Sequence, residues 1–342
     1  MSSKIAIRRF SLIFVILFLI AGTLIIALDW KQMQQVIRQA NWLWAVPCFL
    51  FVVLSYFCLG ISLAMVFRVF RIKEKFGYLV KIGFVSNAAS YILNVGGATG
   101  VSLQYVLLKR RGLDTENILA PSLFQLCLSG LMLIVLLPLS LLYILFSRHL
   151  SFGPVLGISI ATAILMLLLV LSGITVFSSR VRNALLYGLG RLAHFIIRRN
   201  IDSALNDFDD AMSRGVMSIR QHPKVLWILL LVAIGDWGGT IAALWFCFAA
   251  LGTFIGPGVL LTGFSLGIAA GFISMVPGGL GVQEGSMVGI YSLFGVPVRT
   301  AVLAAIMFRI VYYFVPFVIS IGFFHQLLRD SSKEQALERE YH

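Results

Sequence analysis

The chain is a series of long apolar runs separated by short polar segments. Six of these runs are about 20 residues long or longer and contain few charges or none. At a rise of about 1.5 Å per residue, a helix of that length crosses the roughly 30 Å hydrocarbon core of a bilayer. The pattern therefore predicts an all-α polytopic membrane protein with six spanning helices, Phe10–Leu28, Trp42–Phe67, Ile118–Phe146, Val155–Phe177, Leu226–Leu251 and Ala301–Leu328.

Two further apolar segments are interrupted by glycine. Lys81 and Lys109 flank the first segment, which breaks at Val95–Gly100, and the second consists of Val259–Met275 and Val282–Phe294. Each half is too short to span comfortably. A single crossing of the first segment would leave one of its flanking basic clusters outside. We therefore expect two re-entrant hairpins, the first entering from the cytoplasm and the second from outside.

The two interrupted segments match each other at a constant offset of 181 residues. Gly97 corresponds to Gly278 and Gly100 to Gly281, and the register continues without a gap into the preceding apolar run. Because the hairpins enter from opposite sides, the match predicts an inverted repeat, the architecture of many secondary transporters. The predicted organisation is a single integral membrane domain over 1–342, with repeats at about 42–147 and 226–328 and an amphipathic cytoplasmic connector at about 180–222.

Composition and charge support the membrane class and give an orientation. Hydrophobic residues make up 59% of the chain and charged residues 12%, too few charges to cover a water-soluble domain of 342 residues. Under six spans, 22 of the 27 basic residues fall on one side. The positive-inside rule then places both termini in the cytoplasm, with Phe10–Leu28 as an uncleaved first span. The net charge of +13 is thereby explained by anionic lipid headgroups at the cytoplasmic face rather than by nucleic acid.

Three charged residues lie inside the predicted membrane segments, namely Asp236, Glu284 and Arg309. An unpaired charge at the bilayer centre costs at least ~2.5–3.5 kcal/mol, so such residues are usually paired or line a wet cavity. Two interpretations stay open. The three residues contact a polar headgroup or a coupling ion, or they form an ion-pair network that only fixes the hairpin in place.

The second glycine break adds backbone to this candidate site. Gly278, Gly279 and Gly281 let the chain turn and leave amide groups at a half-helix N-terminus, where a phosphate is attracted. The corresponding region of the first repeat is polar but uncharged, with Asn94 and Gln104 as the candidate contacts. Ser55 is the register partner of Asp236. The two halves are thus expected to be electrostatically unequal.

Other chemistry finds little support in the sequence. The four cysteines are scattered through apolar segments without a CxxC pair, and no set of histidines or nucleophile–base pair has a defensible spacing. We therefore expect no metal site, no cofactor and no catalytic residues, and hence a protein that is not an enzyme.

The stretch Pro277–Glu284, followed by Phe294–Val296 and by Arg309 with Tyr312 and Tyr313, resembles the transmembrane region of lysylphosphatidylglycerol synthase/flippase proteins. Stand-alone members of that family are flippase-like inner-membrane proteins. The resemblance implies translocation of an aminoacylated phospholipid between leaflets. Full-length relatives carry a soluble aminoacyl-transferase domain after this region, and the chain ends soon after its last predicted span, so no synthase activity is expected.

The leading functional hypothesis is accordingly a lipid flippase whose cavity lies between the repeats. Asp236 and Glu284 would set the polarity of the cavity, and Arg309 with the glycine amides would hold phosphate. A carrier of polyprenyl-phosphate-linked sugars or another glycolipid is the alternative within transport. From a different class, a membrane scaffold or an accessory subunit of a lipid-modifying enzyme stays open, as does a homodimer.

Overall fold

The computed structural model describes residues 40–93, 98–147, 223–274 and 276–340, together with residue 38 and isolated residues between 156 and 221. Every regular element in this part of the chain is a helix. Four of the helical segments are long and apolar enough to cross a membrane, Trp42–Val69, Thr115–Ser147, Lys224–Ala250 and Val298–Asp330. They confirm four of the predicted spans. The spans predicted at Phe10–Leu28 and Val155–Phe177, and the predicted connector, fall outside the continuously described ranges.

Helices of similar kinds occur in the same order twice along the chain. The first set consists of η1 Trp42–Trp44, α3 Ala45–Val69, α4 Phe76–Leu93, α5 Ala98–Lys109 and α6 Thr115–Ser147. The second set consists of α10 Pro223–Ala250, α11 Pro257–Ile273, η2 Pro277–Gly279, α12 Val282–Leu293, α13 Val298–Arg309, the π-helix η3 Ile310–Phe314 and α14 Val315–Glu340. The end of α3 and the start of α4 recur 181 residues later as the end of α10 and the start of α11.

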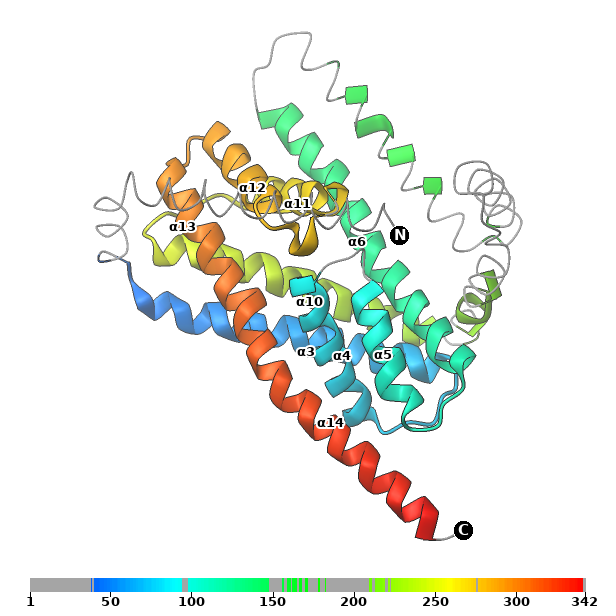
Figure 1. Ribbon diagram of the computed structural model, residues 1–342. Coiled ribbons are helices and arrows are strands. Elements are labelled where there is room, and N and C mark those ends of the chain that lie inside the picture. Colours follow the sequence, from blue (N-terminus) through cyan, green and yellow to red (C-terminus); the bar gives the residue numbers. More distant parts are fainter. Residues whose placement is uncertain are drawn as a thin grey trace, which may run out of the picture.

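The first long helices of the two sets, α3 and α10, pack against each other (Figure 1). Their contacts run in opposite directions along the chain. Cys48 near the start of α3 has its Sγ 3.7 Å from that of Cys247 near the end of α10, whereas Ser55 pairs with Asp236 further along. The two helices are therefore antiparallel. Gly239 allows their close approach, because an added Cβ there would lie 2.9 Å from the Phe51 carbonyl oxygen.

Helices α4 and α5 form a hairpin whose two ends lie together. Glu74, just before α4, forms an ion pair of 3.3 Å with Arg111, just after α5. The outer side of α4 is covered by α14 from the second set, where the Phe84 and Phe323 ring centroids are 5.3 Å apart. We call α4–α5 the first hairpin.

Helices α11 and α12 form the second hairpin, which is packed in the same way. The Tyr291 hydroxyl donates to the Leu260 carbonyl oxygen at 3.1 Å, which ties α12 to α11. Helix α6 from the first set covers α11, and the Ser140 and Ser265 hydroxyls bond across that contact. Each hairpin is thus covered by the last long helix of the other set.

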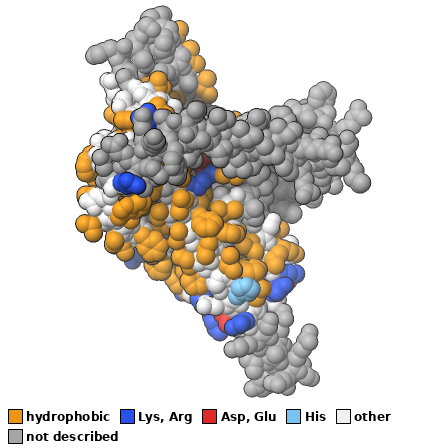
Figure 2. Space-filling view, turned by 60° about the vertical axis from the view of Figure 1, so that its left-hand side comes forward, with side chains coloured by type: hydrophobic (Ala, Val, Ile, Leu, Met, Phe, Trp, Pro, Cys, Tyr) orange, Lys and Arg blue, Asp and Glu red, His pale blue; other side chains and the backbone are white. Residues whose placement is uncertain are grey.

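The surface of the described bundle is mostly apolar. Figure 2 shows hydrophobic side chains over most of the visible described surface, with basic side chains gathered near its lower end. On α3 the exposed hydrophobic residues follow a helical stripe of Leu50, Val53, Leu54 and Phe57. A surface of this kind is suited to hydrocarbon rather than water.

Candidate functional site

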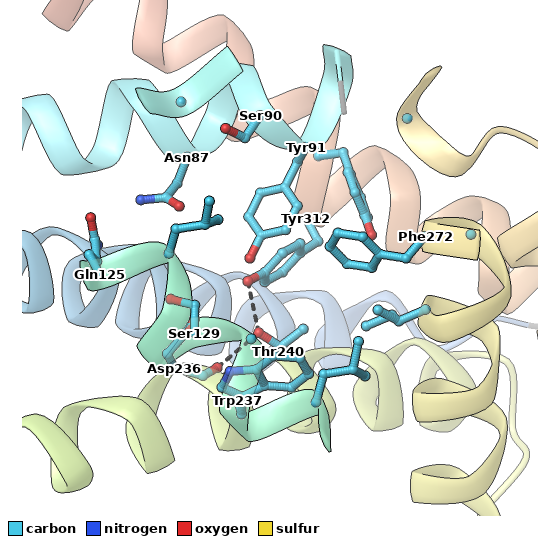
Figure 3. A pocket seen from close by; sticks show the side chains of 18 of the residues that line it. Asn87, Ser90, Tyr91, Gln125, Ser129, Asp236, Trp237, Thr240, Phe272 and Tyr312 are labelled. Carbon is cyan, nitrogen blue, oxygen red and sulfur yellow. Dashed lines mark hydrogen bonds between the residues drawn. The ribbon is translucent and has the colours of Figure 1, made fainter. Parts of the chain in front are cut away.

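A cavity of about 490 Å³ lies between the two helix sets (Figure 3). One wall comes from α4, α5 and α6 and carries amides and hydroxyls, Asn87, Ser90, Gln104, Ser122, Gln125 and Ser129. A second wall comes from α10, α11 and η3 and carries a carboxyl group and aromatic rings, among them Asp236, Trp237, Phe264, Phe272 and Tyr312. We call these the amide wall and the aromatic wall.

Asp236 is held where α3 crosses α10. Ser55 Oγ donates to Asp236 Oδ1 at 2.5 Å and lies 2.8 Å from the Tyr312 hydroxyl. Thr240 Oγ1 lies 2.8 Å from both the Asp236 carbonyl oxygen and the Tyr312 hydroxyl. Asp236 is 7% exposed and lines the cavity. Among the described residues the hydrogen-bond partner of its carboxyl group is a hydroxyl, Ser55 Oγ, which leaves this group available to a ligand.

The π-helix η3 connects this cluster to the second hairpin. Its two adjacent tyrosines serve different neighbours, since Tyr312 joins the Asp236 cluster while Tyr313 accepts from Gln283 Nε2 at 3.0 Å. Short π segments inside α-helices are frequent at functional sites. Here the segment places two buried hydroxyls side by side on the cavity wall.

Glu284 and Arg309 form an ion pair with each other. Glu284 Oε1 lies 2.7 Å from Arg309 Nε, and Glu284 Oε2 accepts from the Gly281 amide at 2.8 Å. Arg309 Nη2 donates to the Gly278 carbonyl oxygen at 2.6 Å. The carboxylate thus caps the start of α12, and the guanidinium ties α13 to the hairpin tip. Neither residue is among the described residues that line the cavity.

The glycines of the second break meet a backbone requirement. Gly278 and Gly281 adopt φ values of +66° and +83°, which only glycine reaches without strain. Gly278 also packs closely on the first hairpin, because an added Cβ would lie 2.9 Å from the Ile92 carbonyl oxygen. The tips of the two hairpins therefore meet. The Gly281 amide, which we predicted to be available to a phosphate, donates its hydrogen bond to Glu284 instead.

The predicted site residues are divided between two places. Asp236, Gln104 and Gly278 line the cavity. Glu284, Arg309 and Gly281 form the closed hairpin tip, with Gly279 packed against Gly271 and Gln283. Asn94 lies outside the described residues. Glu284 and Arg309 thus form an ion pair with each other at the tip of the second hairpin.

The sequence did not predict several residues that line the cavity, above all Trp237, Ser122 and Phe272. Their residue types are common in apolar helices, so nothing in the pattern marked them. A second, mostly apolar cavity of about 220 Å³ lies beyond them, between α3, α6 and α10. It shares Ser129, Asp236 and Trp237 with the first cavity, so these three side chains separate the two spaces.

Long apolar helices, an apolar surface and an internal cavity with a buried carboxyl group together define a multi-pass α-helical membrane protein. The family described as the lysylphosphatidylglycerol synthase TM region matches residues 10–320. The chain belongs to this family.

A relative from Methanothermobacter thermautotrophicus strain Delta H, described as a UPF0104 membrane protein, is 27% identical over 117 residues. The match covers 34% of this chain and 32% of the relative, so it spans about a third of that protein's length.

Proposed function

We propose that the protein moves a lipid between the two leaflets of a membrane, with the lipid headgroup in the cavity and the acyl chains in the bilayer. The observation that carries this proposal is the cavity beside Asp236, enclosed by both helix sets inside an apolar bundle. Its lining includes one exposed hydrophobic residue from each set, Leu126 at 37% and Phe272 at 49% exposure. These residues suit a sideways opening through which acyl chains remain in contact with lipid.

The helix arrangement supports an inverted repeat with re-entrant hairpins. Register partners Ser55 and Asp236 contact each other across the antiparallel pair α3–α10, so a two-fold axis relating the halves passes between them. Helix α14 packs on the first hairpin and helix α6 packs on the second, and the same two-fold axis relates these two contacts. In such an architecture, exchange of conformation between the halves exposes a central site to alternate sides.

The charge distribution supports the proposed orientation, with six spans, both termini cytoplasmic and a location in the cell inner membrane. The base of the first hairpin would face the cytoplasm. There a polar cavity of about 340 Å³ is lined by Arg71, Lys73 and Arg111 together with Glu74 and Asn117. A basic recess at the membrane surface is suited to anionic lipid headgroups.

We propose different roles for the predicted site residues, supported by where each of them lies. Asp236 sets the polarity of the headgroup cavity, whereas Glu284 and Arg309 hold the second hairpin in its turn. The candidate substrates proposed from the sequence are phospholipids, including aminoacylated ones, and glycolipids. The absence of Lys and Arg from the described cavity lining favours a headgroup whose recognition does not depend on phosphate. An internal cavity also supports transport over a scaffold or accessory role.

Leaflet exchange in proteoliposomes tests the proposal. Three fluorescent lipids would be used, phosphatidylglycerol, lysyl-phosphatidylglycerol and monoglucosyl diacylglycerol, with dithionite bleaching of the outer leaflet as the readout. At least one lipid should become bleachable beyond the outer-leaflet fraction in the presence of the protein. Protein-free vesicles set the baseline, and Thr262→Val, which replaces a buried hydroxyl that bonds to the Gly258 carbonyl oxygen within α11 and is not among the described cavity residues, should exchange lipid as the parent protein does. No exchange of any of the three lipids would contradict the proposal.

A further inference from the structure

The amide wall contains buried polar atoms that have no hydrogen-bond partner in the described part of the chain. Gln104 is 4% exposed, and its Nε2 already donates to Ser86 Oγ at 3.1 Å and faces Gln125 Oε1 at 3.4 Å. Its Oε1 has no hydrogen-bond partner among the described residues, and neither has Ser122 Oγ, in a residue that is 1% exposed. Both residues line the cavity. A buried acceptor without a donor is unfavourable, so these atoms point to a ligand that donates hydrogen bonds.

The charges around the cavity indicate which chemical class of hydrogen-bond donor it can hold. The described lining contains one carboxyl group, Asp236, and no lysine or arginine. A phosphate placed in the cavity would therefore meet a carboxylate without a compensating base. A lone ammonium group carries three donors and no acceptor, so it could pair with Asp236 but could not accept from the N–H and O–H groups of the amide wall. Several hydroxyl groups, each able to donate and accept, match the wall better, because amides and serines also do both.

The aromatic wall fits the same kind of ligand. Trp237 and Phe264 contact each other edge to face with ring centroids 6.1 Å apart, and both line the cavity, as does Tyr312. The carbon-bound hydrogens of a sugar ring give it an apolar face, while its hydroxyls project from the rim. A cavity lined by rings as well as by amides can hold both at once. The cavity volume of about 490 Å³ is within the range of small-molecule pockets.

We propose that the headgroup taken into this cavity is an uncharged glycosyl group, with its hydroxyls on Gln104, Ser122 and Asp236 and its ring against Trp237. The inference rests on the proposed lipid transport and names its substrate class. Any phosphate in the lipid would then remain outside the cavity. Gln104 and Ser122 become the residues that determine specificity.

The test compares the three lipids of the leaflet-exchange assay. The protein is purified in a detergent without sugar, because glycosidic detergents would compete for the site. Monoglucosyl diacylglycerol should exchange at least tenfold faster than phosphatidylglycerol or lysyl-phosphatidylglycerol. Faster exchange of either of those two lipids would overturn the glycosyl assignment and leave the transport proposal intact. Absence of exchange for all three would instead remove the transport proposal on which this inference rests.

Two variants locate the recognition. Ser122→Ala removes the unpartnered hydroxyl with little change in volume, and Gln104→Met removes the amide at nearly constant length. Both should slow exchange of the glucosyl lipid several-fold, and an excess of methyl glucoside should quench less of the intrinsic tryptophan fluorescence in them than in the parent protein. Thr262→Val is the folding control. Unchanged glucosyl exchange in both variants, with normal folding by size-exclusion chromatography, would overturn the assignment.

Discussion

The two hairpins occupy equivalent positions in the two helix sets, yet they stabilise themselves in different ways. The second hairpin is closed by an ion pair, Glu284 with Arg309, and by glycines with positive φ. The first hairpin presents uncharged amides and serines to the cavity. The second hairpin contributes its one charged residue, Glu284, to an ion pair at its tip, whereas the first hairpin contributes no charged residue to the described cavity lining. The carboxyl group in that lining, Asp236, comes instead from α10.

Removal of the guanidinium should have the largest effect. Arg309→Ala leaves Glu284 without its partner at 13% exposure and removes the donor to Gly278. Loss of one partner of a buried pair costs about 3 kcal/mol, so the apparent Tm in detergent should fall sharply. The exposed Lys109, replaced by alanine, controls for the loss of one positive charge. A variant that keeps its Tm but loses exchange would instead assign Arg309 to the substrate.

Conservative replacement of the two acids should separate transport from stability. Asp236→Asn removes the charge beside the cavity. A hydrogen bond from the lipid headgroup to that charge would contribute about 1.5–3 kcal/mol to headgroup binding, and the neutral amide weakens it. We expect lipid exchange to drop at least tenfold with little change in Tm. Glu284→Gln should show the opposite pattern, a lower Tm with exchange retained by the folded fraction. If Asp236→Asn lowered the Tm and Glu284→Gln slowed lipid exchange, the roles proposed for the two acids would be reversed.

Replacement of glycines in the second hairpin should change the stability by a smaller amount. Gly278→Ala places a Cβ at a φ of +66° and against the Ile92 carbonyl oxygen, and should cost about 1–2 kcal/mol. Gly285→Ala, on α12 of the same hairpin with open space around it, should be neutral or slightly stabilising. Thermal unfolding of both variants in one detergent is the measurement. Equal destabilisation would show that the turn does not depend on the backbone of Gly278.

The smallest perturbation tests the opposite entry of the hairpins. Single cysteines replace the exposed Lys73, at the base of the first hairpin, and the exposed Val298, just after the second, in a background without the native cysteines. Neither change should affect folding. A membrane-impermeant maleimide should label residue 298 in intact cells and residue 73 only after the membrane is opened. Labelling of both positions from one side would contradict the inverted arrangement.

The sequence predicted the helices well where the physics is local. Four spans and both hairpin breaks follow from length, hydropathy and glycine, and the halves predicted at Val259–Met275 and Val282–Phe294 agree closely with α11 and α12. The π-helix at Ile310–Phe314 was not predicted, because a shift in backbone hydrogen bonding leaves the apolar pattern unchanged. The helix ends are also displaced, since α13 already begins at Val298.

The candidate site was less accessible from sequence. Buried charge identified Asp236, Glu284 and Arg309 but not which of them pair, because the ion pair depends on how α13 packs against the second hairpin. The register related Ser55 to Asp236 as equivalents and could not show that they touch. Equivalence is a property of two segments, whereas contact depends on where the axis passes between them.

The contact between Ser55 and Asp236 has a consequence for how such a protein can originate. On a two-fold axis, a side chain meets its own counterpart. An association of two identical half-length chains would therefore place aspartate against aspartate, two carboxylates at hydrogen-bond distance and mutually repelling in a low-dielectric interior. Serine against serine would leave the axis without an acid. Two halves that have diverged, as within this single chain, can put one carboxyl group at the centre with a hydroxyl to hold it.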